Sequence, residues 1–178
     1  MSFQGFTLPI WVAAAAKAAT ELLVGKPFLP SQELVLPNRH NTLTVNVSSA
    51  ALINGGIAAI ARCHCDSSIA LDITRDLEIL ALVQFQTQSE CLENSRTSDL
   101  SNDWLQIIAG MGVGKTKSTN EICISAYANN LLRINLQPLV PPACLLSLEI
   151  IFPFGEKLAA RTSNKAFGVV EGLAVIGT

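Results

Sequence analysis

The stretch "AGMGVGKTKST", Ala109–Thr119, decides between two folds for this chain. A small residue, four further residues and then Gly-Lys-Thr spell a phosphate-binding loop, which lies between a buried strand and the first turn of a helix. The apolar run "WLQII", Trp104–Ile108, supplies the strand, but no apolar helical face follows until Ile122. The sequence therefore favours a glycine-rich turn between two strands over a nucleotide-binding loop.

Glycines occupy every second position in the middle of this stretch, at Gly110, Gly112 and Gly114. This spacing suits a loop that turns tightly or whose backbone closely approaches a ligand. As a dinucleotide motif it has a misplaced last glycine and no acidic residue after a second strand. The later apolar run Leu145–Phe152 also lacks an Asp that could hold magnesium. An NTPase built on Lys115 and Thr116 remains an alternative.

The rest of the chain predicts strands in groups, with one helix at the start and one late. Ile10–Val24 is rich in alanine, the best helix former, and Gly25 ends it. Helical spacing returns in Ile122–Leu136, whereas Lys26–Asn41 holds three prolines and is predicted as a loop. Strands are expected at residues 43–47, 56–65, 77–86, 104–110 and 145–152. Without regular βαβ alternation, this order predicts an α+β fold with a mixed sheet.

Length and composition exclude several classes of protein. The 178 residues are 49% hydrophobic, which suffices for one domain with its own core. A net charge of −2 without a basic run argues against a nucleic-acid partner. No apolar run reaches the roughly 18 to 20 residues that span a membrane, and the N-terminal apolar stretch carries Lys17 and Glu21, unlike a signal peptide. A cytoplasmic protein is therefore expected.

The five cysteines are odd in number and scattered, which argues against a disulfide framework: Cys63, Cys65, Cys91, Cys123 and Cys144. Cys63-His64-Cys65 raises the question of a metal site. In a strand, the two cysteines would point to one face and His64 to the other. Only one further histidine exists, at His40, so we predict buried strand cysteines and no metal.

Three stretches, in order, resemble one protein family. They are "GFTLPIWVAAAAKAA" (Gly5–Ala19), the glycine stretch described above, and "PFGEKLAARTSNKAFGVVEGLAVIGT" (Pro153–Thr178). Together they resemble the CbiD family, the cobalt-precorrin-5B C1-methyltransferases of anaerobic cobalamin synthesis. The positions that fit the family's motifs include Gly5, Phe6, Thr7, Ala13 to Ala16, Lys17, Gly110, Gly112, Val113, Gly114, Gly155, Glu156, Leu158, Thr162, Asn164, Gly168, Gly172 and Gly177.

The chain also departs from the family's pattern. Leu8–Trp11 stands where many members have Thr-Gly-Thr-Cys. In the acidic segment "DSSIALDIT", Asp66–Thr74, the paired carboxylates of the family are replaced by Ile69 and Ala70. The family's Ile-Asn-Pro-x-Pro-Arg is reduced to Ile134-Asn135. These departures indicate either a divergent branch of the family or altered binding.

The resemblance implies transfer of a methyl group from S-adenosylmethionine (SAM) to C1 of a cobalt-precorrin. Such a transfer needs no metal from the protein and depends mainly on proximity and orientation. The motif positions imply these substrate- or cofactor-binding residues: Thr7, Asp72, Thr74, Gly110, Gly112, Gly114, Thr116 and Asn164. No catalytic residue is assigned. Asp72 and Thr74 could instead cap a turn, Asn164 could hold one, and the alanine helix could serve core packing alone.

Members of the family continue past the Gly-Thr at which this chain stops, into a second, Rossmann-like domain. We therefore expect residues 1–178 to form a single N-terminal CbiD-like domain, truncated after Thr178. A homologue that binds a corrinoid without catalysing methyl transfer is the alternative to the enzyme.

Overall fold

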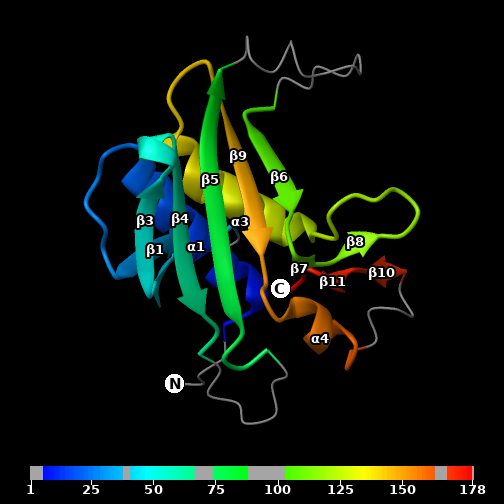
Figure 1. The fold of residues 1–178 in the computed structure, drawn as a ribbon. Helices are drawn as coiled ribbons and strands as arrows, with labels where there is room; N and C mark the ends of the chain where they lie inside the picture. The colour runs from blue at the N-terminus through cyan, green and yellow to red at the C-terminus, as the bar shows by residue number, and fades with distance from the viewer. Residues whose placement is uncertain (1–5, 38–40, 67–73, 88–102, 163–167, 178) are drawn as a thin grey trace.

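A five-stranded mixed sheet forms the centre of the computed structural model, which describes residues 6–37, 41–66, 74–87, 103–162 and 168–177 (Figure 1). Its strands, in spatial order, are β3 (Ser49–Ile53), β4 (Ala58–His64), β5 (Glu78–Thr87), β9 (Cys144–Ile151) and β6 (Leu105–Ala109). Neighbouring strands run antiparallel except β6 and β9, which are parallel. The expected α+β fold with a mixed sheet is confirmed for the described residues.

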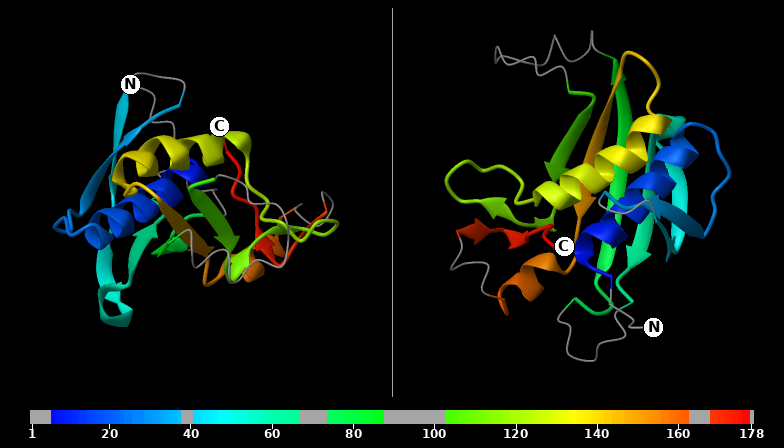
Figure 2. Two further views of the ribbon diagram at one scale, coloured as in Figure 1. Left: turned by 90° about the horizontal axis from the view of Figure 1, so that it is seen from above. Right: turned by 180° about the vertical axis from the view of Figure 1, so that it is seen from behind.

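Two helices, α1 (Leu8–Leu23) and α3 (Ala126–Leu136), cover one face of this sheet (Figure 2). Pro9 suits the first turn of α1, where its missing N–H costs no helical hydrogen bond. The alanines from Ala13 to Ala19 are buried, and α1 contacts β4, β5 and α3. The predicted N-terminal helix is confirmed, and alanine's small side chain explains its close approach to the sheet.

The later helix begins four residues after its predicted start. Ser125 is its N-cap, and the Oγ atom accepts a hydrogen bond from the Ala128 amide at 3.2 Å. Ile122 and Ile124, taken as the first helical turn, are extended instead. They form bridges to Lys115 and Val175, so strand-like pairing replaces helix there.

Two strands that the sequence did not predict are β3, at the edge of the central sheet, and β1, in a small second sheet. Strand β1 (Ser31–Val35) pairs antiparallel with β2 (Thr42–Asn46), so the loop prediction for Lys26–Asn41 was wrong in its middle. Asn135 on α3 fixes the edge of β1. Its Oδ1 accepts from the Val35 amide at 2.8 Å, and its Nδ2 donates to the Val35 carbonyl at 2.9 Å. The reduced Ile134-Asn135 motif therefore supplies a structural amide.

Short elements gather at the end of the sheet where β6 and β9 finish (Figure 1). They are β7 (Gly112–Val113), β8 (Lys115–Thr116), α4 (Gly155–Ala159), β10 (Val169–Val170) and β11 (Gly172–Leu173). Strand β7 runs parallel to β11, and β8 antiparallel to β10. We call these five elements, with the turns between them, the glycine junction. Single helical turns lie elsewhere, at η1 (Asn54–Gly56) and η2 (Gln137–Leu139).

The main core lies between the sheet and the two helices. It is formed by aliphatic side chains from both layers, including Val12, Ile79, Val83, Leu132, Leu148 and Ile150. Within the described residues, every helix is too short or too polar to cross a membrane.

Candidate functional site

The glycine stretch does not have the geometry of a phosphate-binding loop. Strand β6 enters it, but Lys115 and Thr116 lie in strand β8, where a phosphate loop would begin a helix. The amides of Gly114 and Thr116 donate to the carbonyls of Leu173 and Glu121 at 2.7 and 2.8 Å. These N–H groups already have partners within the chain, so the geometry argues against the NTPase alternative.

The glycines let segments of the chain approach one another closely. A Cβ atom added to Gly112 would lie 2.0 Å from the carbonyl oxygen of Phe152. One added to Gly155 or Gly172 would lie 2.1 or 1.9 Å from the carbonyl oxygen of Gly112. Gly112 also has φ = 74°, in the left-handed region that favours glycine. Backbone packing among three segments therefore accounts for these glycines.

The two outer glycines of the loop are equally confined. A Cβ on Gly110 would meet Cγ1 of Ile151 at 2.6 Å, and one on Gly114 would meet Cγ1 of Val169 at 2.5 Å. The Gly110 amide donates to the Ile150 carbonyl at 2.8 Å. The role of all three loop glycines in binding a ligand stays a prediction, whereas their packing role is evident in the structure.

Thr7 carries a polar atom that the described residues leave unpaired. It precedes α1 with extended backbone angles, but its side chain makes no capping hydrogen bond. The Oγ1 atom is buried and has no hydrogen-bond partner among the described residues. Gly177 lies against it, since a Cβ on Gly177 would be 2.7 Å from the Thr7 Cβ. The first and third family-like stretches thus meet at Thr7.

Strand pairing places Thr74 at the same end of the sheet as the glycine loop. Thr74 lies in the turn before β5, and β5 begins where β9 ends, since Leu80 pairs with Ile151. Strand β6 also ends there, because Ala109 pairs with Ile150. The structure therefore gathers several predicted binding residues at one end of the sheet: Thr74, Gly110, Gly112 and Gly114. The predicted positions Asp72 and Asn164 lie outside the described residues.

A cavity of about 160 Å³ lies between α4 and the β10–β11 segment, beside the Gly112–Gly172 contact. Its lining residues are Glu156, Ala159, Ala160, Val169, Val170, Glu171 and Gly172. Glu171 has φ = 66°, unusual for a residue with a side chain, and its Oε2 lies 2.6 Å from Lys115 Nζ. Nothing in the sequence around Glu171 marks it as a binding residue. Glu156 was noted only as a motif match.

The Cys63-His64-Cys65 stretch lies in and just after β4, and the predicted burial of both cysteines is confirmed. The Cys63 thiol donates to the Asn46 carbonyl, with 3.0 Å between sulfur and oxygen. Burial raises the pKa of Cys63 to about 12, so the group stays a neutral thiol. In the part of the chain that the structure describes, no three His, Cys, Asp or Glu residues cluster as metal ligands would.

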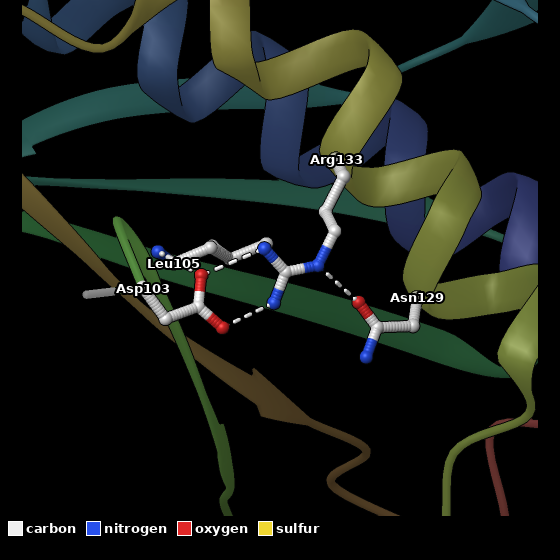
Figure 3. A network of polar contacts seen from close by, with 4 residues as sticks. All are labelled: Asp103, Leu105, Asn129 and Arg133. Atoms are coloured by element: carbon white, nitrogen blue, oxygen red, sulfur yellow. Dashed lines mark hydrogen bonds and ion pairs between the residues drawn. The ribbon is translucent and has the colours of Figure 1, made fainter. Parts of the chain in front are cut away.

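A polar network connects the start of β6 to α3 (Figure 3). The Arg133 guanidinium donates to both carboxylate oxygens of Asp103, including an Nη1–Oδ1 bond of 2.7 Å. Its Nε donates to Asn129 Oδ1 at 2.7 Å, and its cation lies 5.7 Å from the Trp104 ring centre. The hydrogen bonds from Arg133 lower the pKa of Asp103. This network lies at the opposite end of β6 from the glycine loop and supports the fold.

Comparison with known proteins identifies the class. The CbiD family model matches residues 2–178, so the chain belongs to the CbiD family. The family membership predicted from the three stretches is therefore confirmed.

Two curated relatives carry the same name, cobalt-precorrin-5B C(1)-methyltransferase. The protein of Prochlorococcus marinus (strain MIT 9313) is 53% identical over 172 residues, covering 97% of this chain and 44% of its own length. That of Synechococcus sp. (strain CC9902) is 45% identical over 175 residues, covering 98% of this chain and 44% of its own. The chain thus spans less than half the length of these relatives.

A solved structure shares the fold. The crystal structure of the cobalamin biosynthesis protein CbiD from Archaeoglobus fulgidus matches with a TM-score of 0.67 at 20% identity. The match covers 98% of this chain and 52% of that one. At this identity the likeness shows the fold alone.

Proposed function

We propose that this protein is a SAM-dependent methyltransferase acting on C1 of cobalt-precorrin-5B in cobalamin biosynthesis, in the cytoplasm. The observation that carries the proposal is the 53% identity, over 97% of this chain, to a relative with that name. This chain matches 44% of that relative's length. We therefore assign to this chain the activity of a relative that is more than twice as long as the matched region. We further propose that residues 1–178 act as one N-terminal domain of this enzyme.

The methyl donor would supply an electrophilic methyl group on a sulfonium. The chain's contribution is then to bind the two reactants and to hold the carbon of the ring in line with that methyl, since proximity and orientation dominate such a transfer. Two features of the structure fit a bound ligand near the glycine junction. One is the buried, unpaired Oγ1 of Thr7, and the other is the cavity beside Gly172.

We retain the binding residues predicted from the motifs, with roles adjusted to the structure. Thr7 and Thr74 are proposed to offer hydroxyl groups at the end of the sheet, and Thr116 from β8. The glycine loop is proposed to shape the site rather than to bind carboxylates through its amides, because those of Gly110 and Gly114 already donate to chain carbonyls. The proposed binding residues outside the described part of the chain are Asp72 and Asn164.

Titration of the purified chain with S-adenosylhomocysteine (SAH) by calorimetry, with magnesium-ATP in parallel, tests the proposal first. Binding of SAH and not of magnesium-ATP supports a methyltransferase site in this region. Binding of magnesium-ATP alone, abolished by Lys115→Ala, would restore the NTPase alternative. Methyl transfer from isotope-labelled SAM to cobalt-precorrin-5B then separates the enzyme from a homologue that binds a corrinoid without turnover.

Thr7→Val is the matched variant for the same titrations. Valine keeps the shape of threonine and removes the hydroxyl, so a purely structural Thr7 with an unpaired buried Oγ1 should become more stable. If Thr7 binds a ligand, the variant should lose affinity for SAH or for the cobalt-precorrin while its unfolding midpoint stays the same or rises. Unchanged affinity for both ligands would remove Thr7 from the site.

A further inference from the structure

The cavity between α4 and the β10–β11 segment combines an apolar lining with carboxylates. Ala159, Ala160, Val169 and Val170 supply aliphatic groups, and Glu156 and Glu171 supply the two acidic side chains. Apolar walls with a few placed polar groups are typical of small-molecule sites. The lining therefore suits a ligand that has both an aliphatic part and a charge.

The charge of this surface favours a cation. Lys115 neutralises one of the two glutamates, because its Nζ lies 2.6 Å from Glu171 Oε2. Glu156 has no ion-pair partner among the described residues, so the three side chains together carry a net charge of −1. Opposite charge within a few ångströms stabilises a bound cation, more strongly where water is partly excluded.

The backbone of Glu171 is a second observation. Its φ of 66° is a conformation that glycine or asparagine would adopt at lower cost. Strained residues persist where the structure around them holds them in place, and they concentrate at ligand sites. A glutamate at this position therefore points to a role for its carboxylate beyond the turn itself.

The volume limits what the cavity can hold. A water molecule needs about 10 to 15 Å³ measured in this way, so 160 Å³ accommodates on the order of ten non-hydrogen atoms. A whole nucleoside with an amino-acid tail is larger. An aliphatic chain with one or two cationic groups and a carboxylate has the right size.

We propose that this cavity binds the aliphatic, cationic end of the methyl donor, namely the methionyl chain with its sulfonium and ammonium groups. Glu156 and Glu171 stabilise the positive charges, while Lys115 stays paired with Glu171 and leaves the net charge of the three side chains at −1. The inference rests on the proposed function and adds to it the part of the cofactor that this region binds. The remainder of the donor lies outside the cavity.

The test compares two ligands that differ in charge at sulfur. SAM carries the sulfonium, whereas SAH carries a neutral sulfide. Calorimetric titration of the double variant Glu156→Gln/Glu171→Gln should show SAM affinity reduced about tenfold. SAH affinity should fall less, because its neutral sulfide gains no Coulomb attraction from the two carboxylates. Glu33→Gln, which removes one exposed carboxylate on β1, is the control and should leave both affinities unchanged.

Loss of the Lys115–Glu171 ion pair could destabilise the double variant, so a second variant tests the cavity without removing that pair. Ala160→Leu fills the cavity from an exposed position of its lining without changing any charge. It should weaken both ligands to a similar extent while circular dichroism stays that of the wild type. SAM binding that is unaffected by both variants, or absent from the folded wild-type chain, overturns the inference.

SAM affinity and methyl transfer, measured together, separate a wrong cofactor site from a wrong activity. Methyl transfer to cobalt-precorrin-5B that persists together with unchanged SAM affinity in the double variant overturns the inference alone. SAM binding that depends on the two glutamates, without methyl transfer by the wild type, overturns the proposed activity alone. A cavity that binds simple aliphatic ammonium ions as tightly as SAM would also overturn the assignment to the methyl donor.

Discussion

The α1–sheet interface and the glycine junction both depend on small residues, but in different ways. At α1, which contacts β4, β5 and α3, buried alanines such as Ala14 and Ala15 fill the space with methyl groups. At the junction, Gly112 and Gly172 place backbone against backbone, and hydrogen bonds such as that from the Gly114 amide to the Leu173 carbonyl hold the segments. One region is fixed by packing volume, the other by backbone geometry.

Because of this difference, the two regions should respond differently to amino-acid substitution. Packed side chains can relax partly when one methyl group is added, because neighbouring rotamers adjust. A carbonyl oxygen 2.0 Å from a new Cβ cannot move without breaking the hydrogen-bonded pairs around it. The junction should therefore tolerate substitution less than the helix interface, although it contains far fewer buried apolar side chains.

The largest effect is expected for Gly112→Ala. A positive φ and overpacking against Phe152 each cost about 1 to 3 kcal/mol, so we expect a loss of about 4 kcal/mol in the free energy of unfolding. Urea denaturation measures it. The matched control is Gly55→Ala, because Gly55 has φ = 67° but no atom within 4 Å of its added Cβ. Equal losses in the two variants would show that crowding at the junction contributes nothing.

Ala15→Leu tests the helix side of the comparison. Ala15 in α1 is fully buried, and added methyl groups in a packed core cost about 1 to 3 kcal/mol. Thermal unfolding should show a lower midpoint than the wild type, but a smaller loss than Gly112→Ala. Ala51→Leu on the exposed surface of β3 serves as control and should change stability little. If Ala15→Leu lowers stability more than Gly112→Ala, the helix interface tolerates substitution less than the glycine junction.

Asn135→Ala tests the amide that connects α3 with β1. The substitution leaves the Val35 amide and carbonyl without their side-chain partner, which costs about 1 to 3 kcal/mol where the groups stay buried. Hydrogen exchange should show the Val35 amide exchanging faster while β5 amides keep their protection. Unchanged exchange at Val35 would mean that the hydrogen bond to Asn135 does not protect this amide.

The smallest effect is expected for Asp103→Asn, at the opposite end of β6 from the glycine junction. Because Arg133 lowers the pKa of Asp103 in the fold, the carboxylate stabilises the protein above its unfolded pKa of about 3.9, and this contribution is lost as pH falls through the lowered folded value. The pair is partly exposed, so we expect less than about 1 kcal/mol at pH 7. The stability difference from the wild type should shrink below pH 4; a constant difference would contradict the linkage.

The sequence predicted the elements whose pattern is local. Alanine content and spacing revealed α1, and apolar runs revealed β2, β4, β5, β6 and β9. Strand β1 was missed because prolines surround it and its edge depends on Asn135, which is 100 residues away from Val35. The start of α3 was predicted too early because Ile122 and Ile124 form isolated β-bridges with Lys115 and Val175. These pairings involve residues elsewhere in the chain, so the local sequence pattern does not reveal them.

The candidate site was predictable only as a set of positions. The resemblance selected the glycine loop and Thr7, and the structure places the loop beside Gly172 and Thr7 beside Gly177. A sequence cannot distinguish a glycine that approaches a ligand from one that approaches its own chain, since both lack a side chain for the same steric reason. Glu171 was missed because its importance lies in its backbone angle and its distance to Lys115.

The position of α1 has a consequence for how the protein reaches this structure. The helix is synthesised before the elements that it packs on, β4, β5 and α3, and Thr7 at its start contacts Gly177. During synthesis its apolar alanine surface therefore stays uncovered until β4 and β5, and later α3, have been made. Contacts between segments that are distant in the sequence slow folding. Until they form, the exposed apolar surface of α1 is the segment on which a chaperone would be expected to act.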